Sequence, residues 1–108
     1  MYKKNFEEKI SVIIPTYNRY GYLKQLINSI FEQSYNNIEL IVINDNSTDS
    51  TDKYMSKLEK QNSNIKYIKN KENRGPSYSR RTGYEKSEGE YIVFADDDDY
   101  YIDNNLFE

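Results

Sequence analysis

The sequence predicts a Rossmann-like α/β fold with three α/β/α layers, in which helices cover both faces of a mostly parallel sheet with strand order 3-2-1-4. Two observations lead to this prediction. Short apolar runs alternate along the chain with segments of helical pattern, in the order β-α-β-α-β-α-β. Strands that alternate with helices in this way are joined by right-handed crossovers, which make neighbouring strands parallel. With 108 residues, the chain is expected to form one domain.

The first strand and the first helix have the clearest patterns. Residues 10–15 form a nearly continuous apolar run that ends at Pro15, which is typical of a strand buried on both faces. A helix is predicted over residues 21–33, because apolar residues recur there at the i, i+3, i+4, i+7, i+8 spacing of one helix face. These residues are Leu23, Leu26, Ile27, Ile30 and Phe31.

The next three elements follow from shorter patterns. Residues 38–43 predict a second buried strand, which ends at the cap and turn formers of residues 44–49. Thr48 or Ser50 is expected to cap a second helix that runs through about Lys60. The apolar face of that helix is thin. A third strand over residues 65–68 has weaker apolar content, which favours an edge position.

The last elements begin after a polar loop. Pro76 suits the first turn of a third helix that reaches about Lys86, although Gly83 inside it costs about 1 kcal/mol relative to alanine. The apolar run that starts at Tyr91 predicts a buried fourth strand, and the chain then enters four aspartates. Residues 102–108 predict the start of another element.

Composition excludes several classes of function. The net charge of −3 and the pI of about 5.1 give no general attraction to nucleic acid or to a membrane surface. Cysteine and histidine are absent, which excludes disulfides, thiolate or imidazole metal sites, and Ser-His-Asp catalysis. Any metal ion must therefore be held by oxygen. No apolar run has the length of a membrane span and no signal peptide is evident, so a cytoplasmic location is expected, with attachment to the membrane periphery through further segments as the alternative.

The acidic run Asp96-Asp97-Asp98-Asp99 directly follows the fourth predicted strand. Like charges repel by about 4 kcal/mol per pair at 4 Å and an effective dielectric near 20. Water can screen such a run as a solvated turn, or a divalent cation can be held by its hard oxygen ligands. The run alone leaves both interpretations open.

Polar and aromatic side chains follow each predicted strand, where ligands bind in sheets of this kind. Tyr17 follows the first strand, Asp45 the second, and Arg74 lies in the loop after the third. An aromatic ring, a carboxylate, an arginine and an acidic cluster are the groups that a nucleoside diphosphate and its metal require. Neither a G-x-G-x-x-G pattern nor a Walker loop is present.

Four segments together resemble the nucleotide-sugar-binding half of family 2 glycosyltransferases: residues 11–18, 41–49, 73–77 and 89–99. The resemblance runs from about Lys9 to the C-terminus. It implies a GT-A-type fold, a nucleoside diphosphate sugar donor, often a UDP-sugar, and Mn²⁺ or Mg²⁺ as cofactor. It also implies an acceptor that is a saccharide, a lipid or a protein, and a place in cell-wall or polysaccharide biosynthesis.

The same resemblance assigns roles around the nucleoside. It implies that Tyr17 stacks on the base, that Asp45 hydrogen-bonds the base, and that Arg74 binds the base or the diphosphate. We attribute Thr48 and Asp49 to helix capping and the neighbouring arginines Arg80 and Arg81 to a helix surface. None of these last four residues is expected to bind the ligand.

In the acidic run, the resemblance implies that Asp96 and Asp97 bind the ribose hydroxyls. Asp98, the last aspartate of a D-x-D triplet, is the expected metal ligand. The family pattern often has a non-acidic residue in the middle of the triplet, where this chain has Asp97. The division of roles from Asp96 to Asp99 therefore stays open.

The sequence also suggests what this chain does not do. In the family the general base comes from a later segment, and no residue here matches it, so residues 1–108 are expected to form a donor-binding domain without an acceptor-binding part. We do not expect transferase activity from these residues alone. Two other functions stay open: a non-catalytic module that self-associates through exposed strand edges, or a metal-dependent nucleotidyltransferase.

Overall fold

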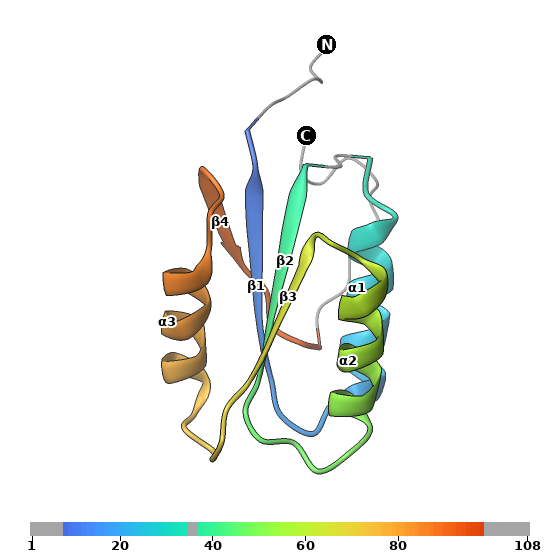
Figure 1. Cartoon of the computed structure of the whole chain (residues 1–108), viewed down its shortest axis with the longest axis vertical. Coiled ribbons are helices and arrows are strands. Elements are labelled where there is room, and N and C mark those ends of the chain that lie inside the picture. The colour runs from blue at the N-terminus through green and yellow to red at the C-terminus, as the bar shows by residue number, and fades with distance from the viewer. Residues whose placement is uncertain (1–7, 35–36, 99–108) are drawn as a thin grey trace.

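The structure is a computed structural model that describes residues 8–34 and 37–98 (Figure 1). Each of the seven predicted elements in this part of the chain is present, with ends that differ from the predictions by at most two residues. In chain order they are β1 (Ile10–Thr16), α1 (Tyr20–Phe31), β2 (Ile38–Asn44), α2 (Thr51–Gln61), β3 (Ile65–Lys69), α3 (Pro76–Lys86) and β4 (Tyr91–Phe94).

The strands form a sheet in the predicted order β3-β2-β1-β4, and every pair is parallel. Ile10 at the start of β1 is level with Ile38 of β2 and with Tyr91 of β4. Helices α1 and α2 cover one face of the sheet, and α3 covers the other (Figure 1). The predicted three-layer α/β/α fold is therefore confirmed.

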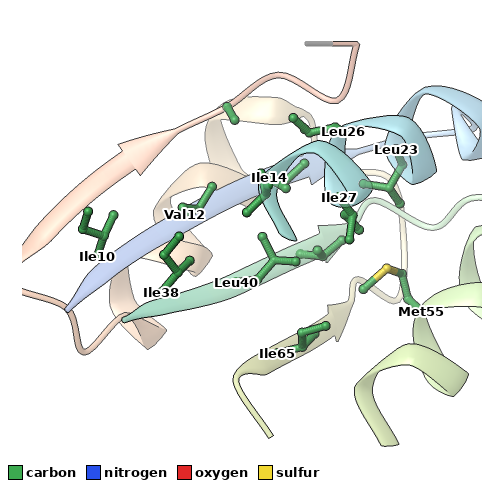
Figure 2. Packing of buried hydrophobic residues seen from close by; sticks show 13 residues of the cluster. Ile10, Val12, Ile14, Leu23, Leu26, Ile27, Ile38, Leu40, Met55 and Ile65 are labelled. Atoms are coloured by element: carbon green, nitrogen blue, oxygen red, sulfur yellow. The ribbon is translucent and has the colours of Figure 1, made fainter. Parts of the chain in front are cut away.

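The larger part of the core lies between the sheet and the helices α1 and α2 (Figure 2). Successive side chains of a strand point to opposite faces, so alternate residues of β1 and β2 face these two helices. Residues that are fully buried in this layer include Val12, Ile14, Leu23, Leu26, Ile27, Leu40, Val42 and Met55.

A smaller core joins the other face of the sheet to α3. Ile13, Ile41 and Ile43 form its centre. Gly83 of α3 lies so close to this layer that an added Cβ would collide with Ile13 Cγ2 and would be 2.8 Å from Ile43 Cδ1. The glycine that weakens α3 as an isolated helix is thus the residue that lets α3 approach the sheet.

The prediction that the fourth strand is buried was wrong. Tyr91 is 56% exposed and Phe94 is 50% exposed, while Val93 packs only partly against the core. Within the described residues β4 pairs only with β1, so it is an edge strand with incomplete cover on its faces. The edge position predicted for β3 is confirmed. Self-association through such edges stays a prediction.

The start of α2 also differs from the prediction. Ser50 is at the N-cap position but makes no side-chain capping hydrogen bond, and Thr48 donates to Asn18. The capping role predicted for Asp49 is confirmed: its Oδ1 accepts from the Thr51 amide at 3.0 Å, and its Oδ2 accepts from the Tyr20 amide at 3.0 Å. A carboxylate accepts at two oxygens, so one side chain can hold the first turns of both α1 and α2.

A charged side chain is buried near the amino ends of the strands. Glu39 of β2 accepts hydrogen bonds from Ser11 Oγ at 2.6 Å, from the Glu88 amide at 2.8 Å and from Lys66 Nζ at 2.8 Å. Burial alone would raise the pKa of Glu39, but these partners hold that pKa below its usual value. Ser11 Oγ in turn accepts from the Gly89 amide. The network ties the turn before β4 to the sheet.

The described helices are short, and some predictions fall outside the described residues. Among the described helices, none is both long enough and apolar enough to span a membrane. The predictions for Asp99 and for an element over residues 102–108 lie outside the described residues.

Candidate functional site

A cleft of about 380 Å³ opens at the carboxyl ends of β1 and β4. In a doubly wound sheet this is the switch point, because the chain leaves β1 in one direction for β2 and returns on its other side as β4. The lining residues are Pro15, Thr16, Tyr17, Arg19, Asp45, Pro76, Ser79, Arg80, Asp96, Asp97 and Asp98. Five of the six residues predicted from the sequence to form a site are in this set, and Arg74 is not.

The loop after β1 presents Tyr17 to the cleft, with 48% of the residue exposed. The next residue, Asn18, has a φ of 52°, a left-handed conformation that asparagine tolerates better than most residues. Asn18 Oδ1 accepts from the Thr48 amide at 2.8 Å, and the Asn18 amide donates to Ser47 Oγ at 2.9 Å. The loops after β1 and β2 are therefore joined directly behind Tyr17.

Asp45 organises the loop after β3. Its Oδ1 accepts from the Arg74 amide at 2.7 Å and from Asn70 Nδ2 at 2.9 Å, and its Oδ2 accepts from the Gly75 amide at 2.9 Å. Burial alone would raise the pKa of Asp45, but these donors lower that pKa below its ordinary value. A carboxylate has about four acceptor positions, so Asp45 can hold this loop and still accept a further donor from the cleft.

The side chain of Arg74 points to other partners. Its Nη1 is 2.9 Å from Glu72 Oε2, and its guanidinium carbon lies 4.4 Å from the centre of the Tyr78 ring. Only the backbone amide of Arg74 joins the Asp45 network. A ligand role for the guanidinium stays a prediction that requires this side chain to change its partners.

The three described aspartates of the acidic run have different surroundings. Asp97 is buried, and its Oδ2 accepts from Thr16 Oγ1 at 2.9 Å. Burial raises the pKa of Asp97, and the Thr16 hydroxyl and the Arg19 charge only partly oppose that increase. Asp96 and Asp98 have side chains that are 65% and 51% exposed. The run therefore presents two solvated carboxylates to the cleft, Asp96 and Asp98, with the buried Asp97 between them.

Two arginines flank the acidic run, and the sequence did not reveal this arrangement. Arg19 Nη1 lies 3.2 Å from Asp98 Oδ2, and Arg80 Nη2 lies 3.4 Å from Asp96 Oδ1. Arg80 is on the surface of α3 as predicted, but it also lines the cleft, whereas Arg81 is exposed and pairs with Glu85 along α3. The signal that could have identified Arg80 is its position one turn beyond Pro76, at the helix end that faces the strand ends.

A divalent metal site requires several oxygen ligands that converge on one point. Within residues 8–34 and 37–98, no three acidic side chains converge into a group that could hold a metal ion. The carboxylate oxygens of Asp98 are nevertheless hard ligands of the kind that Mg²⁺ and Mn²⁺ prefer, and they are open to the cleft. The donor chemistry fits such a cation, with Arg19 as the present counter-charge of Asp98.

Comparison with known proteins agrees with the fold. The model of the family described as glycosyl transferase family 2 matches residues 11–108. An uncharacterized glycosyltransferase of Rickettsia bellii is 43% identical over 100 residues, which are 93% of this chain and 14% of the relative. The chain therefore spans only a small part of that relative's length.

Two solved structures share the fold. The crystal structure of S. aureus TarS 1-349 in complex with UDP has a TM-score of 0.80 and 36% identity, over 90% of this chain and 29% of TarS 1-349. The mannosyltransferase PcManGT from Pyrobaculum calidifontis, solved in complex with GDP-Man and Mn²⁺, has a TM-score of 0.83 over 93% of this chain and 30% of its own. At 24% identity, PcManGT supports the fold alone.

Proposed function

Because this chain belongs to glycosyl transferase family 2, we propose that its cleft binds a nucleoside diphosphate sugar, with a UDP-sugar as the first candidate, together with Mn²⁺ or Mg²⁺. The chain would then act as the donor-binding domain of a glycosyltransferase. One observation carries the proposal: an exposed tyrosine ring, a buried aspartate and a run of aspartates flanked by two arginines line one cleft at the switch point of the sheet. TarS, a relative at 36% identity, was solved with UDP.

The nucleoside is assigned to the part of the cleft near Tyr17 and Asp45. Tyr17 has an exposed ring that can stack on a base, and its removal leaves the core intact. Asp45 is held ionised by its amide partners and accepts a hydrogen bond from a base N–H. Arg74 already contributes its amide to this network, and its side chain is assigned to the base or the diphosphate.

The ribose and diphosphate are assigned to the acidic run. Asp96 and Asp97 accept from the ribose hydroxyls, and Asp98 provides an oxygen ligand for the cation. When bound, that cation neutralises the negative charge of the diphosphate leaving group. Arg80, whose guanidinium faces the cleft beside Asp96, adds a fixed positive charge on the α3 side.

Calorimetric titration of the chain with UDP, with and without Mn²⁺, tests the proposal. We expect binding that depends on the cation. Asp98→Ala is expected to remove the dependence on Mn²⁺ and to leave the metal-free melting temperature unchanged or raised, because its side chain is half exposed. Tyr17→Ala is expected to weaken UDP binding about fivefold or more, since stacking of a base on an aromatic ring contributes about 1–3 kcal/mol.

Glu85→Ala is the matched control, because it removes an exposed carboxylate on α3 that does not line the cleft. Its UDP titration is expected to equal that of the unmodified chain. If a chain that is folded by circular dichroism releases no heat with UDP or GDP in either metal condition, the proposed donor site is wrong. A large fall in the melting temperature of Asp98→Ala would make Asp98 a structural residue.

A further inference from the structure

The hydroxyl of Tyr67 belongs to a chain of hydrogen bonds that leads from α2 across β3 to the loops of the cleft. Tyr67 is on β3, and it is not one of the described residues that line the cleft. Its hydroxyl donates to Asp52 Oδ1 in the first turn of α2 at 2.6 Å and accepts from Asn44 Nδ2 at 2.9 Å. Burial and the bond to Asp52 raise the pKa of Tyr67, so the hydroxyl keeps its proton at neutral pH.

Asn44 is the next link of this chain. It is the last residue of β2, directly before Asp45, and it is completely buried. Its Oδ1 accepts from the Ser47 amide at 2.8 Å, while its Nδ2 donates to the Tyr67 hydroxyl. A buried amide group that loses a partner is strongly disfavoured, so both ends of the Asn44 side chain depend on these bonds.

The hydrogen bonds of this chain have one consistent direction. The carboxylate of Asp52, which also pairs with Lys69 at 3.8 Å, only accepts hydrogen bonds. The Tyr67 hydroxyl therefore has to donate to Asp52, and its oxygen is left to accept from Asn44. Because Asn44 turns its Nδ2 toward Tyr67, its Oδ1 faces the Ser47 amide. The hydroxyl thus selects one of the two orientations of the Asn44 amide group.

The chain ends beside the two residues that we assign to the nucleoside, Tyr17 and Asp45, which we call the nucleoside site. Ser47 Oγ accepts from the Asn18 amide at 2.9 Å, and Asn18 directly follows Tyr17. On the other side, Asn44 is the neighbour of Asp45 in the sequence. A displacement of Asn44 would therefore disturb both halves of the nucleoside site.

We propose that Tyr67 is a positioning residue of the nucleoside site, an inference that rests on the proposed donor function. Without the hydroxyl, the buried Nδ2 of Asn44 lacks its acceptor, so the Asn44 side chain moves. The Ser47 amide then loses its own acceptor for part of the time, and fewer molecules hold the two loops in the binding geometry. The apparent affinity for a ligand falls in proportion to that fraction.

Tyr67→Phe tests the inference, because it removes the hydroxyl and keeps the ring. Calorimetric titration with UDP and Mn²⁺ is expected to show an affinity about fivefold lower than that of the unmodified chain, which corresponds to one lost hydrogen bond of about 1 kcal/mol. Tyr84→Phe is the matched control, since Tyr84 is exposed on α3 and does not line the cleft. Its affinity for UDP is expected to be unchanged. Equal affinity of Tyr67→Phe and the unmodified chain would overturn the inference.

Amide hydrogen exchange in the nucleotide-free chain separates positioning from a general loss of stability. Tyr67→Phe is expected to speed exchange of the Ser47 amide about fivefold, because that amide loses its acceptor. The amide of Val42, which is buried in the middle of β2, reports global unfolding and is expected to change less. An increase at Val42 that equals or exceeds the increase at Ser47 would mean a purely structural role for Tyr67 and would overturn the inference.

Asn44→Ala tests the link itself. It is expected to weaken UDP binding at least as much as Tyr67→Phe, because it removes the acceptor of the Ser47 amide directly. Adding Tyr67→Phe to Asn44→Ala is expected to weaken binding no further, since both changes act on the same link. Additive losses would contradict the proposed path. If Asn44→Ala is not folded by circular dichroism, Ser47→Ala, which breaks the next link, takes its place in the same comparison.

The proposed function and this inference fail in different ways. If the folded, unmodified chain binds neither UDP nor GDP, the donor function is wrong and the role of Tyr67 falls with it. If the unmodified chain binds UDP and Tyr67→Phe binds it equally well, only the role of Tyr67 is wrong.

Discussion

Arg19 Nη1 lies 3.2 Å from Asp98 Oδ2 and 3.8 Å from Asp97 Oδ1. The guanidinium thus occupies the place of a counter-ion for two carboxylates that line the cleft at the carboxyl ends of β1 and β4. A cation that binds Asp98 has to compete with Arg19 for the same oxygens. The pair is half exposed, so water and salt reduce the strength of the attraction.

Removal of Arg19 is therefore expected to favour the cation. Arg19→Gln is expected to tighten Mn²⁺ binding to the nucleotide-free chain about two- to fivefold, which corresponds to the contribution of up to about 1 kcal/mol of an exposed ion pair. Electron paramagnetic resonance of free Mn²⁺ measures this affinity. Arg81→Gln, which removes an arginine paired only with Glu85, is the control with unchanged affinity. Weaker Mn²⁺ binding in Arg19→Gln would show that Arg19 supports the cation.

Asp45→Asn is expected to destabilise the chain by about 1–3 kcal/mol, because an amide group would face the Arg74 and Gly75 amide donors that the carboxylate now satisfies. Urea unfolding at pH 7 measures this loss. The pKa of Asp45 is lowered in the folded chain, so its contribution is present above the unfolded pKa and is lost as the pH falls through the folded pKa. The difference between the two proteins is expected to narrow at acidic pH. Glu72→Gln, at an exposed carboxylate, is expected to cost less than about 0.5 kcal/mol.

Gly83→Ala and Gly21→Ala form a matched pair within helices. An alanine Cβ at position 83 would press on Ile13, and overpacking of about 1–3 kcal/mol is expected to exceed the gain in helix propensity of about 1 kcal/mol. Among the described residues, apart from its chain neighbours and the adjacent backbone of α1, no heavy atom lies within 4 Å of a Cβ added at position 21, so Gly21→Ala is expected to be neutral or stabilising. Thermal unfolding of both variants distinguishes the sites. A stabilised Gly83→Ala would show that α3 can move away from the sheet without cost.

Glu39→Gln is expected to destabilise the fold by about 3 kcal/mol, because it leaves Lys66 and the buried network without the carboxylate. That value is at the lower end for a broken buried pair, since Lys66 is 36% exposed and can be hydrated again. Glu85→Gln breaks an exposed helical pair and is expected to cost about 0.5 kcal/mol or less. Chemical unfolding compares the two. Equal small losses would mean that the network near the amino ends contributes little.

Patterns local in sequence were enough to predict the order and direction of the strands. The apolar runs at 10–15 and 38–43 each identify a buried strand, and the crossover rule makes the strands parallel. The Rossmann-like strand order, with β3 and β4 on opposite sides of the central pair, is the one that the structure has. The position of the cleft could be predicted for a similar reason, since Tyr17, Asp45 and the acidic run each come directly after a strand.

Features that depend on contacts between distant residues could not be predicted. The exposure of β4 depends on what covers the sheet beyond it, which the run of residues 91–95 does not encode. Arg19 and Arg80 meet their aspartates across 79 and 16 residues of sequence, and a charged residue on a loop or helix gives no sign of such a partner. Glu39 sits in an apolar strand, and its burial requires Ser11 and Lys66 from two neighbouring strands.

The side chain of Asn18 has a consequence for protein engineering. Its Oδ1 accepts from the amides of Thr48 and Asp49, so the segment that carries Tyr17 and the segment after Asp45 share one set of hydrogen bonds. A chimaera that imports only one of these loops from a relative would leave those backbone amides without their hydrogen-bond acceptor. The unit of exchange between related chains is therefore the pair of loops, and successful grafts will carry residues 16–19 and 44–49 together.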